Sequence, residues 1–150
     1  MNIRVLIALL IASFVSAVSL SVRAQTEVDT LTLFRKAEAG DGRALATLKT
    51  QATQGDARSQ LELGSMYMLG VGVQKNYVEA IKWNRRAAGQ GVPEAQINMG
   101  LMSSAGLGMK QDYELAAQWF RKAADEGNLW GQYFLARLYT EVLHPMDTGL

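Results

Sequence analysis

The residues with the most evident chemical potential are one histidine and a pair of serines. His144 is the only histidine, and a metal site around it would need carboxylate ligands at a recognisable spacing, which the sequence lacks. Ser103 and Ser104 lack the Gly-x-Ser-x-Gly pattern of an activated serine, and they lie far from the histidine along the chain. We therefore predict a solvated histidine and two ordinary helix hydroxyls.

Two glycine loops, Gly70-Val71-Gly72 and Gly106-Leu107-Gly108, raise the question of phosphate binding. A phosphate loop follows a strand and carries a lysine directly after its last glycine, and neither loop meets these conditions. Both loops also recur at one common spacing, which indicates a structural role. The sequence thus predicts no catalytic residue, no metal site and no cofactor, and we expect no enzymatic activity.

Length and composition bound the remaining possibilities. The 150 residues suffice for one domain of ordinary size, and 15 lysines and arginines stand against 14 aspartates and glutamates. This balance gives no electrostatic argument for binding nucleic acid. No cysteine is present, so neither a disulfide nor a lipid-modified cysteine is available. Stability must therefore come from packing.

The first residues have the pattern of a secretory signal peptide. Arg4 supplies a positive charge, residues 5–20 are apolar with small residues interspersed, and Val22 and Ala24 stand three before and one before a cleavage point. Residues 1–24 are therefore predicted to be removed, leaving a periplasmic or secreted protein without membrane insertion. An uncleaved anchor is the alternative, because the apolar run is only slightly shorter than the roughly 20 residues that span a bilayer.

The most informative pattern is a self-similarity at a spacing of 36 residues. Segments 55–90 and 91–126 are identical at 12 of 36 aligned positions, and a partial third copy begins at residue 127. We assign residues 25–54 to a linker and capping helices, 55–90 and 91–126 to two repeats, and 127–150 to a partial repeat with a C-terminal cap. Each copy predicts two helices around a glycine loop, so the fold class is all-α: a short α-solenoid of antiparallel helix pairs, with about seven helices.

Helix starts are marked by side chains that accept hydrogen bonds from free backbone amides, at Asp56, Asn76, Asp112 and Asn128. Asn76 and Glu79 also have the spacing of a capping box, in which the glutamate bonds back to the first residue.

Two residue types recur inside the helices. Gly64 and Gly100 occupy equivalent positions, where glycine costs about 1 kcal/mol relative to alanine, so we expect both to allow a close approach of the partner helix. Trp83 and Trp119 also occupy equivalent positions and are predicted to be packing residues.

These residues resemble the Sel1-like repeat, a relative of the tetratricopeptide repeat, over about residues 55–139. The resemblance implies right-handed superhelical stacking with the first helix of each pair lining a concave face. In bacteria it implies a periplasmic or secreted adaptor, a regulator of membrane sensors, or a factor that engages host proteins. The matching residues are Leu63-Gly64, Tyr67, Gly70-Val71-Gly72-Val73, Tyr77, Ala80, Trp83, Ala87-Ala88 and Gly91, then Met99-Gly100, Gly106-Leu107-Gly108-Met109, Asp112-Tyr113, Ala116, Trp119, Ala123-Ala124 and Gly127.

The candidate partner-binding site is a stripe along the three first helices, placed by analogy with tetratricopeptide geometry. Apolar groups mixed with a few charges on a concave surface suit the recognition of a helix or an extended peptide. The alternative is that Leu61, Ile97 and Tyr133 only pack adjacent first helices together. The predicted stripe consists of Arg58, Leu61, Ser65, Met68, Glu94, Ile97, Leu101, Ser104, Trp130, Tyr133 and Arg137.

The predicted function is an exported protein–protein interaction module, an adaptor or regulator whose partner is another protein. A periplasmic immunity or inhibitor protein against a toxic effector is the alternative, and a cell-envelope hydrolase or a structural subunit is less favoured. Weak self-association through the C-terminal end is a further hypothesis, because residues 144–150 are too short and polar to cover the last helix well.

Overall fold

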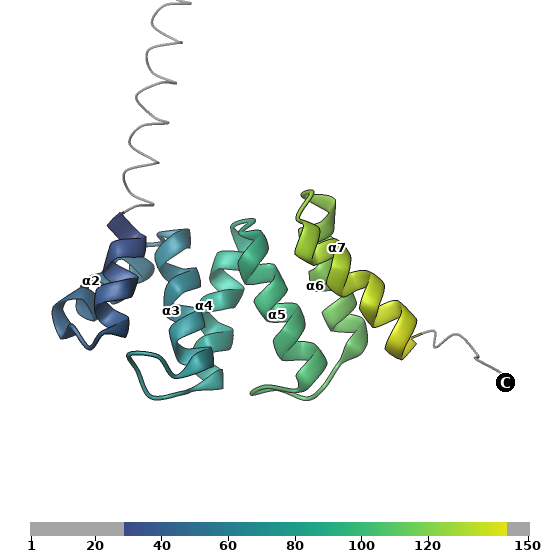
Figure 1. Ribbon diagram of the computed structural model, residues 1–150, viewed down its shortest axis with the longest axis horizontal. Helices are drawn as coiled ribbons and strands as arrows, with labels where there is room; N and C mark the ends of the chain where they lie inside the picture. The colour runs from purple at the N-terminus through teal and green to yellow at the C-terminus, as the bar shows by residue number, and fades with distance from the viewer. Residues whose placement is uncertain (1–28, 144–150) are drawn as a thin grey trace, which may run out of the picture.

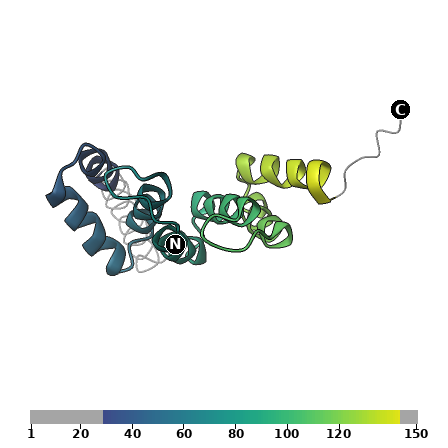
Figure 2. The ribbon, with the colours of Figure 1, turned by 90° about the horizontal axis from the view of Figure 1, so that it is seen from below.

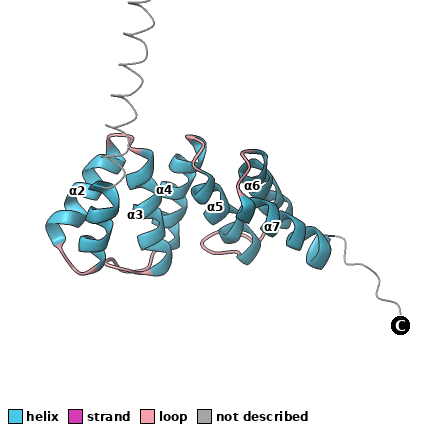
Figure 3. Ribbon diagram, turned by 45° about the horizontal axis from the view of Figure 1, so that its top comes forward, coloured by secondary structure: helices cyan, strands magenta, loops and turns pink. Residues whose placement is uncertain are grey.

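A computed structural model describes residues 29–143, and this part of the chain is built of helices without a strand (Figure 3). The predicted all-α class and helix number are confirmed, whereas the signal peptide and His144 lie outside the described residues. The helices are residues 29–38, α2 (Gly42–Thr53), α3 (Ala57–Leu69), α4 (Tyr77–Gly89), α5 (Pro93–Ala105), α6 (Tyr113–Asp125) and α7 (Leu129–Leu138), and a π-helix, η1 (Tyr139–Leu143), follows.

The helices form a row of antiparallel hairpins, from the blue N-terminal end to the yellow C-terminal end (Figures 1 and 2). Helix α3 pairs with α4 and α5 pairs with α6, while α7 packs on α6 as the start of a further pair. In addition, α3 contacts α5 and α5 contacts α7 directly, and no comparable contact joins α4 to α6 within the described chain. The first helices therefore contact one another along the row, in addition to packing on their own partners.

The predicted helix starts are confirmed by their hydrogen bonds. Asp56 accepts from the amide of Ser59 at 2.6 Å, and the remaining predicted starts accept in the same way. Helix α5 begins differently, because Val92 offers no side-chain acceptor, while Pro93 at the first helical position has a favourable backbone angle and one free amide fewer.

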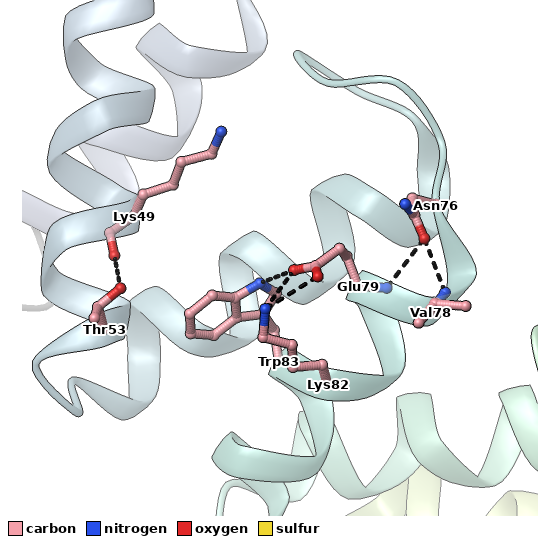
Figure 4. A network of polar contacts seen from close by, with 7 residues as sticks. All are labelled: Lys49, Thr53, Asn76, Val78, Glu79, Lys82 and Trp83. Carbon is pink, nitrogen blue, oxygen red and sulfur yellow. Dashed lines mark hydrogen bonds and ion pairs between the residues drawn. The ribbon is translucent and has the colours of Figure 1, made fainter.

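The capping box predicted for Asn76 and Glu79 is only half formed. Asn76 Oδ1 accepts from the amides of Val78 and Glu79 at 3.0 and 3.1 Å. However, the amide of Asn76 donates to the carbonyl of Tyr67, and the Glu79 carboxylate accepts from Trp83 Nε1 and Lys82 Nζ (Figure 4). The prediction of a reciprocal bond was wrong because a tryptophan one turn further along the helix offers Glu79 a donor.

The two glycines inside the first helices allow close helix packing, as predicted. A Cβ at Gly64 would lie 2.5 Å from Asn84 Nδ2 on α4, and a Cβ at Gly100 would overlap the ring of Phe120 on α6. Asn84 and Phe120 are equivalent residues of the two repeats, so the same close contact is made with a polar side chain in one and an aromatic ring in the other.

The Gly-x-Gly loops also have a packing role. Gly72, with φ of 69°, faces the carbonyl oxygen of Ala37, where a Cβ would lie only 2.5 Å away. Gly108, with φ of 72°, faces Tyr77, where a Cβ would lie 2.6 Å from that residue's own Cβ. Each loop therefore rests on the helix pair that precedes it, and both the left-handed backbone and the tight contact require glycine.

The core is a chain of small clusters instead of one central mass, as expected for a repeat stack. The tryptophans connect neighbouring pairs: Trp83 of α4 packs with Ala52 of α2, and Trp119 of α6 packs on the cluster that contains Leu61 of α3. Their predicted role as packing residues is confirmed.

Candidate functional site

The two serines make ordinary intrahelical hydrogen bonds. Ser103 Oγ donates to the carbonyl of Met99 at 2.8 Å, and Ser104 Oγ donates to the carbonyl of Leu101 at 3.0 Å. Within residues 29–143, no group of three or more histidine, cysteine, aspartate or glutamate side chains is arranged to hold a metal ion. The candidate site is therefore the predicted stripe on the surface of the first helices.

Two residues of the predicted stripe lie in the core. Leu61 is 4% exposed and packs with Ala95 and Met99, and Ile97 is 8% exposed and packs with Phe120. This matches the alternative that these side chains join adjacent first helices, so they cannot contact a partner without rearrangement.

The other predicted residues reach the surface. Trp130 is 61% exposed and Tyr133 is 51% exposed, which places two large aromatic side chains in solvent on α7. Glu94 and Arg137 are also exposed, and the remaining five residues are half-buried: Arg58, Ser65, Met68, Leu101 and Ser104.

Three residues that the sequence analysis missed connect the stripe. They are Glu62, Asn98 and Phe134. Each lies four positions after the first stripe residue of its helix, whereas the prediction chose the residue three positions after it. Residues at these positions interact between neighbouring first helices. We call the following set the inner surface: Arg58, Glu62 and Ser65 on α3, Glu94, Asn98 and Leu101 on α5, and Trp130, Tyr133, Phe134 and Arg137 on α7.

The α3 end of the inner surface is charged. Arg58 Nε lies 2.9 Å from Glu62 Oε1, and the Glu62 side chain is only 9% exposed. Burial raises the pKa of Glu62 above its ordinary value of 4.5, Arg58 opposes that change, and the charge of Glu94 on α5 adds to it. The one guanidinium here pairs with Glu62, so the Glu94 carboxylate of the neighbouring helix is left without an ion-pair partner among the described residues.

The middle of the inner surface is a hydrogen-bonded polar cluster. Asn98 Nδ2 donates to Asn84 Oδ1 at 2.9 Å and approaches Ser65 Oγ at 3.3 Å. Asn84 is fully buried, and its own Nδ2 donates to the carbonyl of Ala80 at 3.0 Å. These bonds satisfy the buried amide and tie α3, α4 and α5 together.

The α7 end is aromatic. Phe134 stacks on Phe120 with ring centroids 5.4 Å apart, and Trp130 and Tyr133 contact Phe134 at 6.1 and 5.2 Å. Beside these rings lies a pocket of about 240 Å³ between α5, α6 and α7. It is lined by Leu101, Ser104, Tyr113, Phe120, Phe134, Arg137, Leu138, Glu141 and Val142.

The arrangement is suited to contact with another molecule over an extended area, from a charged end to an aromatic end. None of the helices between residues 29 and 143 combines the length and the hydropathy that crossing a bilayer requires.

Comparisons with known proteins agree with the repeat architecture. The Sel1 repeat family model matches residues 57–92 and 93–128, which are the α3–α4 and α5–α6 pairs. No curated protein matches the chain.

The solved structures that are similar to this chain include two repeat proteins. A Sel1 repeat protein from Oxalobacter formigenes is 41% identical, with a TM-score of 0.59, and the match covers 66% of this chain and 74% of that one. The protein c5321, a protective antigen present in uropathogenic Escherichia coli strains and displaying an SLR fold, is 32% identical, with a TM-score of 0.68. That match covers 79% of this chain but only 27% of c5321, so this chain spans about a quarter of its length.

The helix pairs, the glycine contacts and these matches have one explanation. Proteins built in this way generally mediate protein–protein interaction, and the chain belongs to the Sel1 repeat family as an α-solenoid.

Proposed function

We propose that the chain is an exported adaptor or regulator that binds a partner protein on its inner surface. The observation that carries the proposal is the exposure of Trp130 and Tyr133 on α7, at 61% and 51%. Large aromatic side chains dominate the binding energy of many protein interfaces, and leaving them in water has no benefit for folding.

The neighbouring side chains support this choice of surface. From the aromatic residues on α7, the inner surface continues to a polar cluster on α5 and a charged pair on α3, and these first helices pack closely against their partners at glycines. Apolar anchors surrounded by polar groups are the usual composition of a protein-binding surface.

The binding surface is tested by affinity capture from a bacterial envelope extract, using the full chain as bait. A variant with Trp130→Ala and Tyr133→Ala removes the two aromatic groups, and Val78→Ala on α4 is the matched control, because Val78 is 68% exposed but lies on a second helix. Circular dichroism verifies that each variant keeps its helices.

A partner retained by the parent and the control but lost by the double variant supports the proposal. Retention by all three proteins means that binding uses another surface. If no protein is retained by the parent, the adaptor role is wrong for envelope partners.

Export is a separate part of the proposal and rests on the pattern of residues 1–24. The intact mass of the protein recovered from the periplasm of an expressing bacterium tests it. A mass that begins at Gln25 is expected, whereas a mass that retains Met1, or recovery only from the cytoplasm, contradicts cleavage or export.

A further inference from the structure

The spaces between adjacent first helices are built differently in the two repeats. Between α3 and α5, the side chains of Ser65, Asn84 and Asn98 meet in the hydrogen-bonded cluster. The residues 36 positions further on are Leu101, Phe120 and Phe134, so all three polar groups are replaced by apolar ones. These three apolar residues line the pocket between α5 and α7.

The pocket has the size and the lining of a site for one apolar side chain. Its volume is about 240 Å³, and an apolar cavity of roughly 150 Å³ is enough to hold benzene. Its inner wall is made by Leu101, Phe120 and Phe134, while Arg137 and Glu141 form an exposed ion pair at 2.9 Å on its rim. A phenylalanine, leucine or methionine side chain fits these dimensions and this chemistry.

A second feature of the inner surface is uncompensated negative charge. Glu94 is exposed and forms no ion pair with any described residue, and the guanidinium of Arg58 is already paired with Glu62. The charge of Glu94 acts on Glu62 from the neighbouring helix. A lysine or arginine of a partner would therefore be attracted to this point.

The distance between the two features is set by α5. Glu94 and Leu101 are seven residues apart and lie on the same face of the helix, so they are about 10 Å apart along its axis. An extended peptide covers this distance in about three residues.

We propose that the partner segment bound by this chain carries a bulky apolar side chain that enters the pocket and a lysine or arginine three or four residues away that pairs with Glu94. This inference rests on the proposed function and adds the chemistry of the bound segment.

The test is selection of random twelve-residue peptides displayed on phage, with the full chain immobilised by biotin on its lysines. No lysine belongs to the inner surface, so immobilisation leaves that surface open. Selected peptides are expected to share a bulky apolar residue and a basic residue at the stated separation. The affinity of the best synthetic peptide is then measured by fluorescence polarisation.

Four variants locate the peptide. Leu101→Ser and Ser104→Met place in the pocket the residues found at the equivalent positions 65 and 68 of the preceding repeat, so both are compatible with the helix. Each is expected to weaken binding at least tenfold. Glu94→Lys is expected to do the same, whereas Glu114→Lys, an equal charge reversal at an exposed residue in the first turn of α6, is expected to have no effect.

Selected peptides without the shared pattern, or peptides whose affinity is unchanged by the pocket variants and by Glu94→Lys, would overturn this inference and leave the proposed function intact. If no peptide is selected while the capture experiment retains a partner, this inference is again wrong. Failure of both experiments overturns the proposed function together with the inference.

Discussion

Gly100 on α5 lies directly against the ring of Phe120 on α6, and the ring in turn stacks on Phe134 of α7. Because Gly100 has no side chain, α5 and α6 can approach closely. The same contact fixes the position of the Phe120 ring, which lines the pocket. A change at this glycine affects both stability and the proposed binding pocket.

We expect Gly100→Ala to lower the free energy of unfolding by about 1–3 kcal/mol, because the new methyl group must displace a buried ring. Gly89→Ala is the matched control, since a Cβ there meets nothing within 4 Å and alanine is the better helix former. Urea denaturation followed by circular dichroism measures both. Equal stability of Gly100→Ala and the parent would show that α6 shifts without cost.

Glu79 provides a second prediction, because its carboxylate accepts from Trp83 Nε1 at 3.0 Å. Glu79→Leu places at this position the residue found at 115 in the second repeat, where the buried Nε1 of Trp119 has no partner among the described residues. The loss is expected to be about 0.5–1.5 kcal/mol in the free energy of unfolding. Glu79→Gln keeps an acceptor, so its stability should be closer to that of the parent than the stability of Glu79→Leu is. If thermal denaturation shows Glu79→Leu to be the more stable variant, the hydrogen bond does not stabilise the fold.

In the second repeat, Glu126 and Gln96 form only part of the contact that Gln90 and Gln60 form in the first repeat. There, Gln90 Nε2 donates to Gln60 Oε1 at 2.8 Å, whereas Glu126 only accepts from Gln96 Nε2, and the buried Gln96 Oε1 has no donor within the described chain.

Glu126→Gln supplies this donor, so we expect it to stabilise the fold by about 0.5–1.5 kcal/mol in chemical denaturation. Glu126→Ala removes the acceptor without adding a donor and should give no gain. A Gln variant no more stable than the Ala variant is incompatible with this account.

The raised pKa of Glu62 predicts a pH-dependent difference between the parent and Glu62→Gln. In the folded state the proton is held more tightly than in the unfolded chain, so Glu62 contributes stability that is fully present below pH 4.5 and is lost as pH rises through the folded-state pKa. The parent should therefore gain stability relative to Glu62→Gln as the pH is lowered from 7.5 to 4.5. Urea denaturation at several pH values measures this difference, and a constant difference would mean that Arg58 fully compensates the burial.

The helix pairs, their caps and the close glycine contacts could be predicted from the sequence because each depends on local chemistry repeated at one spacing. The neighbours of each side of the first helix could not be predicted in this way. At about 100° per residue, Leu61 lies about 60° to one side of Arg58 and Glu62 lies about 40° to the other, so both fit one stripe. Both side chains are buried in the fold, and only their neighbours separate them: Leu61 packs with Ala95 and Met99 of α5, whereas Glu62 pairs with Arg58.

The contents of the inter-helix spaces also depend on partners distant in sequence. Asn98 and Ser65 come from different repeats, and nothing in the spacing of either one indicates that they meet over Asn84. The pocket at the equivalent place arises from three separate substitutions, whose joint effect appears only when the helices are stacked.

The contacts of the Gly-x-Gly loops give the stack a direction. Gly72 packs on residue 37 and Gly108 packs on residue 77, so the loop of each hairpin contacts a segment nearer the N-terminus. Each hairpin therefore packs on a segment that has left the ribosome before it. Docking in chain order of this kind would leave little apolar surface uncovered while the rest of the chain is still being made.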